Sequence, residues 1–315
     1  MGKFRRIMVV VDPAMQRSTA FRRGVALAKR SGAELVLLLV TYHAAILRPR
    51  LVDPGLTERA IDGYLAARRR WLDSEAEALR REGLASVSTR AVWHKRAHVA
   101  IAREALELAP DLVIRDIQPS SALQRAVFTP ADWHVLRLCP VPLMLVDEDA
   151  GSYPQRILAA VDILDSNDKP GELNDEIVTQ ALRMAAVCDA SVHLVHASNV
   201  SPALALGESV MIDPALGEEL RERSREELAA FAAKHGIPAE RRHLLEGHPS
   251  QVIPALAREL NVDLTVLGTV QRGTLRRAIM GATAEEILHE LDCDVLVLKP
   301  PGFAAALDPE LLEDD

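Results

Sequence analysis

The segment Leu267–Thr283, LGTVQRGTLRRAIMGAT, contains the residues best suited to bind an anion. Gly268 follows an apolar run, Gly273 lies in a basic stretch, and Gly281 comes just before a predicted helix. Glycines let backbone N–H groups approach a phosphate, and the N-terminus of a helix attracts negative charge. Arg272 adds a cation that can face phosphate. The segment therefore resembles a phosphate-binding loop that either still binds phosphate or has lost that ability.

The elements that position this loop alternate between strand and helix. An apolar content of 49% with only 3% aromatic residues indicates an aliphatic core, as in a parallel α/β protein. In the second half, strands are expected near 157–161, 192–197, 242–245, 264–267 and 295–298, and helices near 173–188, 215–235, 251–260 and 284–291. The first half has the same order, with a long helix at 57–81 that stops at Gly83. This order predicts an α/β fold with a five-stranded parallel, doubly wound (Rossmann-like) sheet in each half.

The chain also repeats itself. RRIMVVVDP at 5–13 corresponds to QRILAAVDI at 155–163, and each apolar run ends in an aspartate, Asp12 or Asp162. At a constant offset of 152 residues, 105–114 matches 257–266 and 122–136 matches 274–288. We therefore expect two tandem domains, 1–150 and 151–315, that pair as an internal pseudo-dimer. Ligands of such sheets bind at the carboxyl ends of strands where the strand order reverses, so Asp12, Asp162 and Gly268 lie where a ligand is expected.

These features resemble the universal stress protein family. The tandem halves, the aspartate that closes each first strand, EGHPSQVI at 246–253 and the loop at 267–288 carry the resemblance over nearly the whole chain. VFTPADWHVLRLCPVP at 127–142 resembles the E-type tandem members in particular. The resemblance implies an adenine-nucleotide alpha hydrolase-like fold and a non-enzymatic role in tolerance of stress.

Nucleotide-binding members of that family carry Gly-x-x-Gly, nine residues, then Gly followed by Ser or Thr. Gly268 and Gly281 fill the first and third glycine positions, but Gln271 replaces the second glycine and Ala282 replaces the hydroxyl residue. Thr283 could supply a displaced hydroxyl. The resemblance therefore implies a weakened site for ATP or another adenine nucleotide, with Asp162 beside the adenine. The candidate residues are Asp162, Gly268, Arg272, Gly273, Gly281, Ala282 and Thr283.

Interpretations without a ligand stay open for the same residues. Thr283 and Glu286 match a capping box, S/T-x-x-E, which explains a helix start on its own. The arginines can form a solvated face. The carboxylate of Asp162 can accept hydrogen bonds from nearby backbone N–H groups at a strand-to-helix turn.

The first half lacks the loop. Asp116 stands at the position of the first glycine, and no glycine occurs from Leu84 through Ala150. A helix start is predicted here instead: Thr129 is the cap, Pro130 takes the first helical position, and Asp132 places a negative charge at the positive end of the helix. We therefore expect no ATP in this half, and only local backbone hydrogen bonds at Asp12.

Neither the histidines nor any known catalytic motif in the sequence indicates an enzyme. His193 and His196 lie three apart on a predicted strand and so point to opposite faces, as structural histidines. His94 and His98 have no nearby cysteine or second carboxylate to complete a metal site. The chain contains neither G-x-S-x-G nor G-x-x-x-x-G-K-[ST]. The alternative that remains open is slow ATP hydrolysis in the second half.

Composition limits the partners and the compartment. The net charge of −8 disfavours nucleic acid, and no apolar run is long enough to span a membrane. The three cysteines are expected to be free thiols in a reducing cytoplasm. Besides the internal pseudo-dimer, a homodimer and a small-molecule ligand are the partners considered. The segment 197–217 has scattered apolar residues and could be a lid over an apolar or lipid-like ligand, which is the second alternative function. The acidic tail 307–315 is expected to be exposed.

Overall fold

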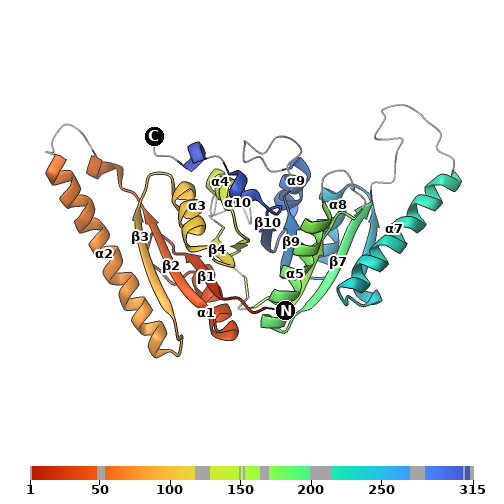
Figure 1. Ribbon diagram of the computed structural model, residues 1–315, viewed down its shortest axis with the longest axis horizontal. Helices are drawn as coiled ribbons and strands as arrows, with labels where there is room; N and C mark the ends of the chain where they lie inside the picture. The colour runs from red at the N-terminus through yellow and green to blue at the C-terminus, as the bar shows by residue number, and fades with distance from the viewer. Residues whose placement is uncertain are drawn as a thin grey trace. The chain divides into compact units, whose positions relative to one another are not determined.

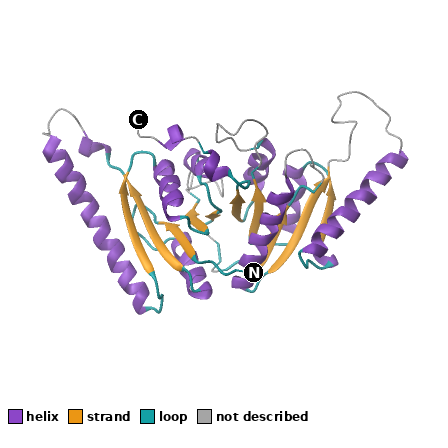
Figure 2. Cartoon of the chain, in the orientation of Figure 1, coloured by secondary structure: helices purple, strands orange, loops and turns teal. Residues whose placement is uncertain are grey.

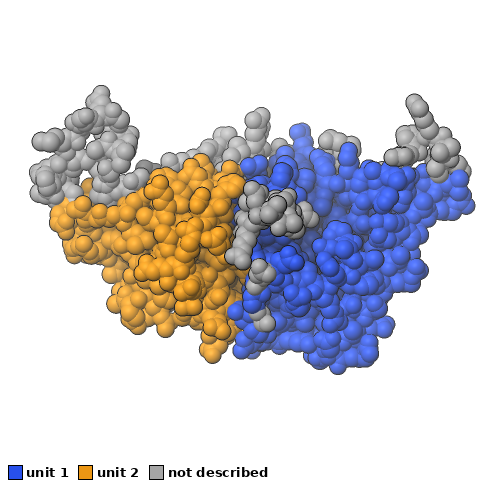
Figure 3. Space-filling view, turned by 180° about the vertical axis from the view of Figure 1, so that it is seen from behind, with its two compact units in different colours: residues 1–153, 274–278, 302–315 blue, residues 154–273, 279–301 orange. Residues whose placement is uncertain are grey.

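The computed structural model describes residues 2–47, 54–117, 128–148, 150–151, 153–163, 170–198, 214–269, 281–307 and 309–312. The chain divides into two compact units, which Figure 3 colours separately. Unit 1 is Met1–Tyr153 with Gly302–Asp315, and unit 2 is Pro154–Gly273 with Ile279–Pro301. The stretch Thr274–Ala278, grouped with unit 1, lies outside the described residues.

Unit 1 contains a parallel sheet with the strand order β3-β2-β1-β4-β5 (Figure 1). The order reverses at β1, because the chain first builds outward through β2 and β3 and then returns to pair β4 with β1. Its strands are β1 (Arg6–Val10), β2 (Glu34–Thr41), β3 (Val87–Trp93), β4 (Leu112–Asp116) and β5 (Leu143–Val146). Its helices are α1 (Thr19–Ser31), η1 (Ala44–Leu47), α2 (Pro54–Arg81), α3 (Ala97–Leu108), α4 (Pro130–Leu138), α10 (Phe303–Ala306) and η3 (Pro309–Leu312).

Unit 2 has the same topology, with the strand order β10-β9-β6-β7-β8. Its strands are β6 (Arg156–Ala160), β7 (Ser191–Ser198), β8 (Arg242–Glu246), β9 (Leu264–Gly268) and β10 (Asp294–Leu298). Its helices are α5 (Pro170–Cys188), α7 (Pro214–Lys234), η2 (Ala239–Arg241), α8 (Pro249–Glu259) and α9 (Ala282–Glu290). The prediction of two five-stranded parallel α/β domains is confirmed. The prediction that the halves pair as a pseudo-dimer stays a prediction.

The sheets form because the strand sequences are aliphatic on both faces. In β2, every residue from Leu35 to Thr41 is buried, and in β6 the same holds from Ile157 to Ala160. Helices flank the strands in each unit (Figure 2), and α1 and α5 pack on the central strands β1 and β6. The long helix α2 ends at Arg81 and Gly83 follows it with a φ of +94°, a conformation that glycine adopts at low cost.

Matching aspartates hold the start of the central strand in each unit. Asp111 Oδ2 accepts hydrogen bonds from Arg5 N at 2.7 Å and Arg6 N at 3.0 Å. In unit 2, Asp263 Oδ2 accepts from the backbone N–H groups of Gln155 and Arg156, both at 2.8 Å. The repeat in the sequence is thus a repeat of contacts as well as of elements.

The C-terminal segment of the chain belongs to unit 1. Leu307, Leu311 and Leu312 pack against a buried cluster of α3 and α4 formed by Val99, Ala102 and Leu138. The expectation of an exposed acidic tail is therefore wrong for these leucines. The reason is tertiary, since only the folded unit presents an apolar face that can bury them.

Candidate functional site

The strand order of unit 2 reverses at β6, and two candidate residues lie at this point. Asp162 follows the carboxyl end of β6, and Gly268 is the last residue of the neighbouring strand β9. The register pairs Ala160 with Leu267, so the two strand ends lie side by side. This is the position at which open α/β sheets bind ligands.

Asp162 presents its carboxylate at this edge. Its backbone N–H donates to Asn174 Oδ1 at 3.1 Å, and Asn174 Nδ2 donates to its carbonyl oxygen at 2.5 Å. Asn174 lies on α5 and is buried. The amide thus fixes the backbone of Asp162 while the side chain stays 63% exposed. The described polar neighbour of the carboxylate is His196, with Nδ1 3.9 Å from Asp162 Oδ1.

Gly268 has a packing role of its own. A Cβ at this position would lie 2.6 Å from Leu173 Cδ2 and 3.1 Å from Ile177 Cδ1. Both side chains belong to α5, which packs on β9 at this point. A side chain here would displace Leu173, so glycine suits the close approach of the helix to the strand whether or not a phosphate binds.

Gly281, Ala282 and Thr283 form the start of α9. Gly281 is the N-cap, with φ −66° and ψ 140° and without a hydrogen bond from a capping side chain, and the side chains of Ala282 and Thr283 are exposed. The capping box predicted for Thr283 and Glu286 is wrong, because the helix already begins at Ala282 and Thr283 lies inside it. Glu286 instead lies near His248, with 3.7 Å between Oε2 and Nδ1. Among the described residues, the N-cap of α9 thus supplies no side chain to the first N–H groups of the helix, and the acidic residue of the first turn is Glu285.

Two of the candidates, Arg272 and Gly273, lie outside the described residues, as does Gln271. The same holds for 199–213, most of the segment considered as a lid. The described part of the candidate site therefore consists of Asp162, Gly268 and the start of α9, which the strand order brings to one edge of the unit 2 sheet.

At the equivalent place in unit 1, the start of α4 is covered by side chains of the unit itself. Thr129 caps the helix, with its Oγ1 accepting from Asp132 N at 3.3 Å, while Asp132 Oδ2 accepts from Thr129 N at 2.8 Å. Asp132 Oδ1 also accepts from Arg115 Nη1 at 2.7 Å, and the side chains of this pair are 0% and 8% exposed. The predicted cap is confirmed, and Arg115 completes it with a buried charge.

Asp116 occupies the position that Gly268 has in unit 2. Its Oδ1 accepts from Ala20 N at 2.8 Å, so it satisfies a backbone donor at the start of α1. Burial raises the pKa of Asp116, and the nearby Asp12 raises it further. Asp12 itself accepts from Ala14 N at 2.6 Å, as predicted for a carboxylate at a strand-to-helix turn.

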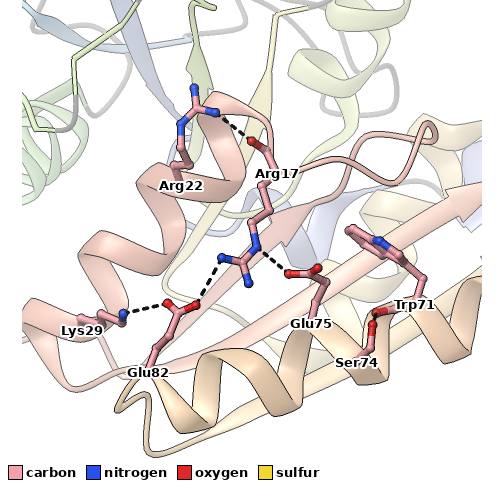
Figure 4. Close-up of polar contacts among 7 residues, drawn as sticks. All are labelled: Arg17, Arg22, Lys29, Trp71, Ser74, Glu75 and Glu82. Atoms are coloured by element: carbon pink, nitrogen blue, oxygen red, sulfur yellow. Dashed lines mark hydrogen bonds and ion pairs between the residues drawn. The ribbon is translucent and has the colours of Figure 1, made fainter.

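The loop between β1 and α1 of unit 1 is also tied to α2 (Figure 4). Arg17 Nε donates to Glu75 Oε2 at 2.6 Å, and Arg17 Nη1 lies 3.3 Å from Glu82 Oε1. Lys29 on α1 donates to the same Glu82 at 3.2 Å. These ion pairs tie α1 and the segment before it to the C-terminal part of α2 and to Glu82 after it.

The histidines of β7 point to opposite faces, as predicted. His193 Nδ1 lies 3.0 Å from His243 Nε2, and burial lowers the pKa of both residues. His196 is 2% exposed, and its Nδ1 lies 3.2 Å from the carbonyl oxygen of Val161. Among the described residues its Nε2 has no hydrogen-bond partner, so the expectation of a satisfied structural histidine is only half right. Within the described ranges, no group of three or more His, Cys, Asp or Glu residues could hold a metal ion.

Sequence reasoning missed Asn174 and the Arg115–Asp132 pair. Asn174 gave no signal, because an asparagine inside a helix is unremarkable until the fold brings it to Asp162. Arg115 did give one: an arginine in the middle of an apolar strand needs a buried partner, and the equivalent residue of the second repeat is Leu267.

Comparison with known proteins agrees with this architecture. The sequence model of the universal stress protein family matches residues 3–147 and 154–299. The chain is 31% identical to Universal stress protein E of Escherichia coli (strain K12) over 100% of both chains. It is 30% identical to Universal stress protein E of Salmonella typhi over 98% of both chains.

Solved structures show the same fold. A functionally unknown protein from Pseudomonas aeruginosa PAO1 matches with a TM-score of 0.75 and 30% identity, over 98% of this chain and 96% of that one. A universal stress protein from Archaeoglobus fulgidus matches with a TM-score of 0.64 and 18% identity, over 93% and 98%. The chain belongs to the universal stress protein family, in a tandem form with two copies of the domain.

None of the helices in the described ranges is both long enough and apolar enough to cross a membrane.

Proposed function

We propose that this protein is a cytoplasmic, non-enzymatic stress-response protein whose second unit binds an adenine nucleotide weakly and whose first unit binds none. The observation that carries the proposal is the difference between the two helix starts. In unit 1, the start of α4 is covered by Thr129, Asp132 and Arg115. The equivalent residues of unit 2 are Gly281, Ala284 and Leu267, and α9 has no capping side chain.

A helix start whose N-cap supplies no side chain can accept an external carboxylate or a phosphate at its first N–H groups; the acidic residue in the first turn of α9 is Glu285. In unit 1, the Asp132 and Asp116 carboxylates would repel a phosphate at this edge. In unit 2, Asp162 is the exposed carboxylate and lies on the neighbouring strand end, where it can accept a hydrogen bond from a base. This arrangement supports a nucleotide with its phosphates toward α9 and its base toward Asp162.

The expected affinity is low. Gln271 stands at the second glycine position of the motif of nucleotide-binding family members, and Ala282 lacks the hydroxyl that would donate to a phosphate. A hydrogen bond to a charged acceptor contributes about 1.5–3 kcal/mol, which corresponds to roughly a 10- to 150-fold change in affinity. Negligible hydrolysis is expected for the same reason; slow hydrolysis is the alternative. The apolar-ligand alternative depends on 199–213 and stays a hypothesis.

Titration with ATP, followed by calorimetry or NMR, tests the proposal. We expect at most one nucleotide per chain, and tighter binding after Gln271→Gly with Ala282→Ser. The matched control places the same two residue types at the equivalent positions of unit 1, Pro119→Gly with Pro130→Ser, and we expect it to create no second site. Two equivalent sites in the wild type, or no binding by the restored variant, would contradict the proposal.

A further inference from the structure

Two histidines face each other on neighbouring strands of unit 2. His193 is the third residue of β7 and His243 the second residue of β8, so both lie toward the amino ends of their strands. The register pairs Val195 with His243, and strand residues two apart share a face, so both imidazoles project from the same face of the sheet. Nδ1 of His193 lies 3.0 Å from Nε2 of His243, and the ring planes differ by 21°. The pair is thus separate from the candidate nucleotide site, which lies at the carboxyl ends of strands.

Both rings are neutral near pH 7. Burial lowers the pKa of His193 and of His243, and the charges of Arg241 and Arg156 lower the pKa of His193 further. Glu259, at the end of α8, acts on His243 in the opposite direction and brings a negative charge to the pair. Two neutral imidazoles share one N–H···N hydrogen bond, in which one nitrogen donates and the other accepts. Neutral imidazole nitrogens are also the form that binds a transition-metal ion.

The separation of the two nitrogens suits one shared ion. Imidazole nitrogens bind zinc at about 2.0–2.1 Å, so two of them on one ion are about 2.9 Å apart at a right angle and about 3.3 Å apart at the tetrahedral angle. The observed 3.0 Å lies near the right angle that tetragonal Cu(II) and Ni(II) sites adopt. Because the nitrogens now face each other, each ring has to turn toward the ion. Both side chains are only partly buried, and β8 ends the strand order of unit 2, so the rings have solvent beside them.

We propose that His193 and His243 bind one divalent transition-metal ion, Cu(II) in preference to Ni(II) or Zn(II), with water in the remaining positions. The preference follows the general order of affinity of nitrogen ligands for these ions. The ring that donates the shared proton changes tautomer, so the proton moves to its other nitrogen and the freed nitrogen binds the ion. The backbone ladder between β7 and β8 already holds the two side chains together, which lowers the cost of ordering them. Since the described residues offer no group of three or more His, Cys, Asp or Glu ligands, the site is open and suits an ion that exchanges with solvent.

Titration of the metal-free, full-length protein with Cu(II), Ni(II) or Zn(II) chloride tests this site. Electron paramagnetic resonance of the Cu(II) form reports the coordinated nitrogens, and we expect an ion bound by two imidazoles. Losing a hydrogen-bond partner of a metal ligand already weakens binding about 10- to 100-fold, so His193→Asn or His243→Asn should raise the dissociation constant of this site about 10-fold or more. His289→Asn is the matched control, because it removes an exposed histidine of the same unit, on α9, and should leave the site unchanged.

Nuclear magnetic resonance of the wild type provides a measurement that does not depend on the folding of a variant. Cu(II) is paramagnetic and broadens the resonances of nearby nuclei, so the ring signals of His193 and His243 should broaden together as the ion is added. The inference is overturned if both signals stay sharp when the protein is saturated with Cu(II). It is also overturned if the double variant His193→Asn with His243→Asn binds as many Cu(II) ions, and as tightly, as the wild type. Neither result depends on ATP, so the proposed function stands or falls separately.

Discussion

The buried pair Arg115–Asp132 offers the sharpest test of how unit 1 closes its ligand edge. Asp132 is fully buried and accepts from Thr129 N, Thr129 Oγ1 and Arg115 Nη1 at 2.7–2.8 Å. Asp132→Ala removes these bonds and leaves the Arg115 guanidinium buried without its counter-charge. Removing one partner of a buried pair costs about 3–5 kcal/mol. With a urea dependence of about 2 kcal/mol per M, the unfolding midpoint should fall by about 1.5–2.5 M.

Tryptophan fluorescence reports this loss for unit 1 alone. The chain has three tryptophans, Trp71, Trp93 and Trp133, and all three belong to unit 1. Urea unfolding followed by fluorescence therefore measures unit 1, while circular dichroism follows both units. We expect the fluorescence transition to move and the remaining transition to stay.

The double variant Arg115→Leu with Asp132→Ala reproduces Leu267 and Ala284 of unit 2. It removes both charges and retains only the loss of the helix cap, about 1 kcal/mol. It should therefore be more stable than Asp132→Ala alone. If Asp132→Ala fails to fold, Asp132→Asn keeps the size of the side chain and an acceptor for Thr129 N. A double variant as unstable as the sum of its parts would refute the reasoning.

Three further changes should alter unit 1 in defined directions. Burial and neighbouring positive charges, with His134 first among them, lower the pKa of His98 from 6.5 to about 4. The unfolded chain therefore binds the proton at a higher pH than the folded one, and the stability of unit 1 should fall from pH 6.5 toward pH 4. The fall should be less steep in His98→Gln, as urea titrations followed by fluorescence can show. The pKa of Asp116 is raised, so its ionised form is disfavoured in the fold, and Asp116→Asn should raise the urea midpoint at pH 7 with an advantage that shrinks in acid. Deletion of 303–315 exposes Val99 and its neighbours and should lower the midpoint, whereas deletion of 313–315 alone should not.

The element order and the cap of α4 could be predicted from the sequence because both depend on local chemistry. A strand needs only its aliphatic run, and Thr129-Pro130 with Asp132 is a helix start by composition alone. A cap at Thr283 starts α9 two residues late; the sequence favours it because threonine caps more strongly than glycine in general. The chain begins the helix at Ala282 because Gly281 already takes the extended conformation.

Contacts between distant segments could not be predicted. Leu311 packs against the cluster that contains Val99, more than 200 positions away in the sequence, and no pattern near the C-terminus predicts this contact. The hold of Asn174 on Asp162 likewise depends on where α5 crosses β6. Both contacts follow from the crossover geometry rather than from either segment.

Gly268 shows why half of a motif is weak evidence for a ligand. The glycine fits a phosphate loop, but the closeness of Leu173 favours it even in a protein that binds nothing. Its presence therefore does not separate the two interpretations. Asp116 at the same place in unit 1 does discriminate, because its carboxylate occupies this strand end and accepts from Ala20 N at the start of α1. The argument for a nucleotide in unit 2 rests on the start of α9, where the N-cap Gly281 supplies no side chain, and on the exposed carboxylate of Asp162 at the neighbouring strand end.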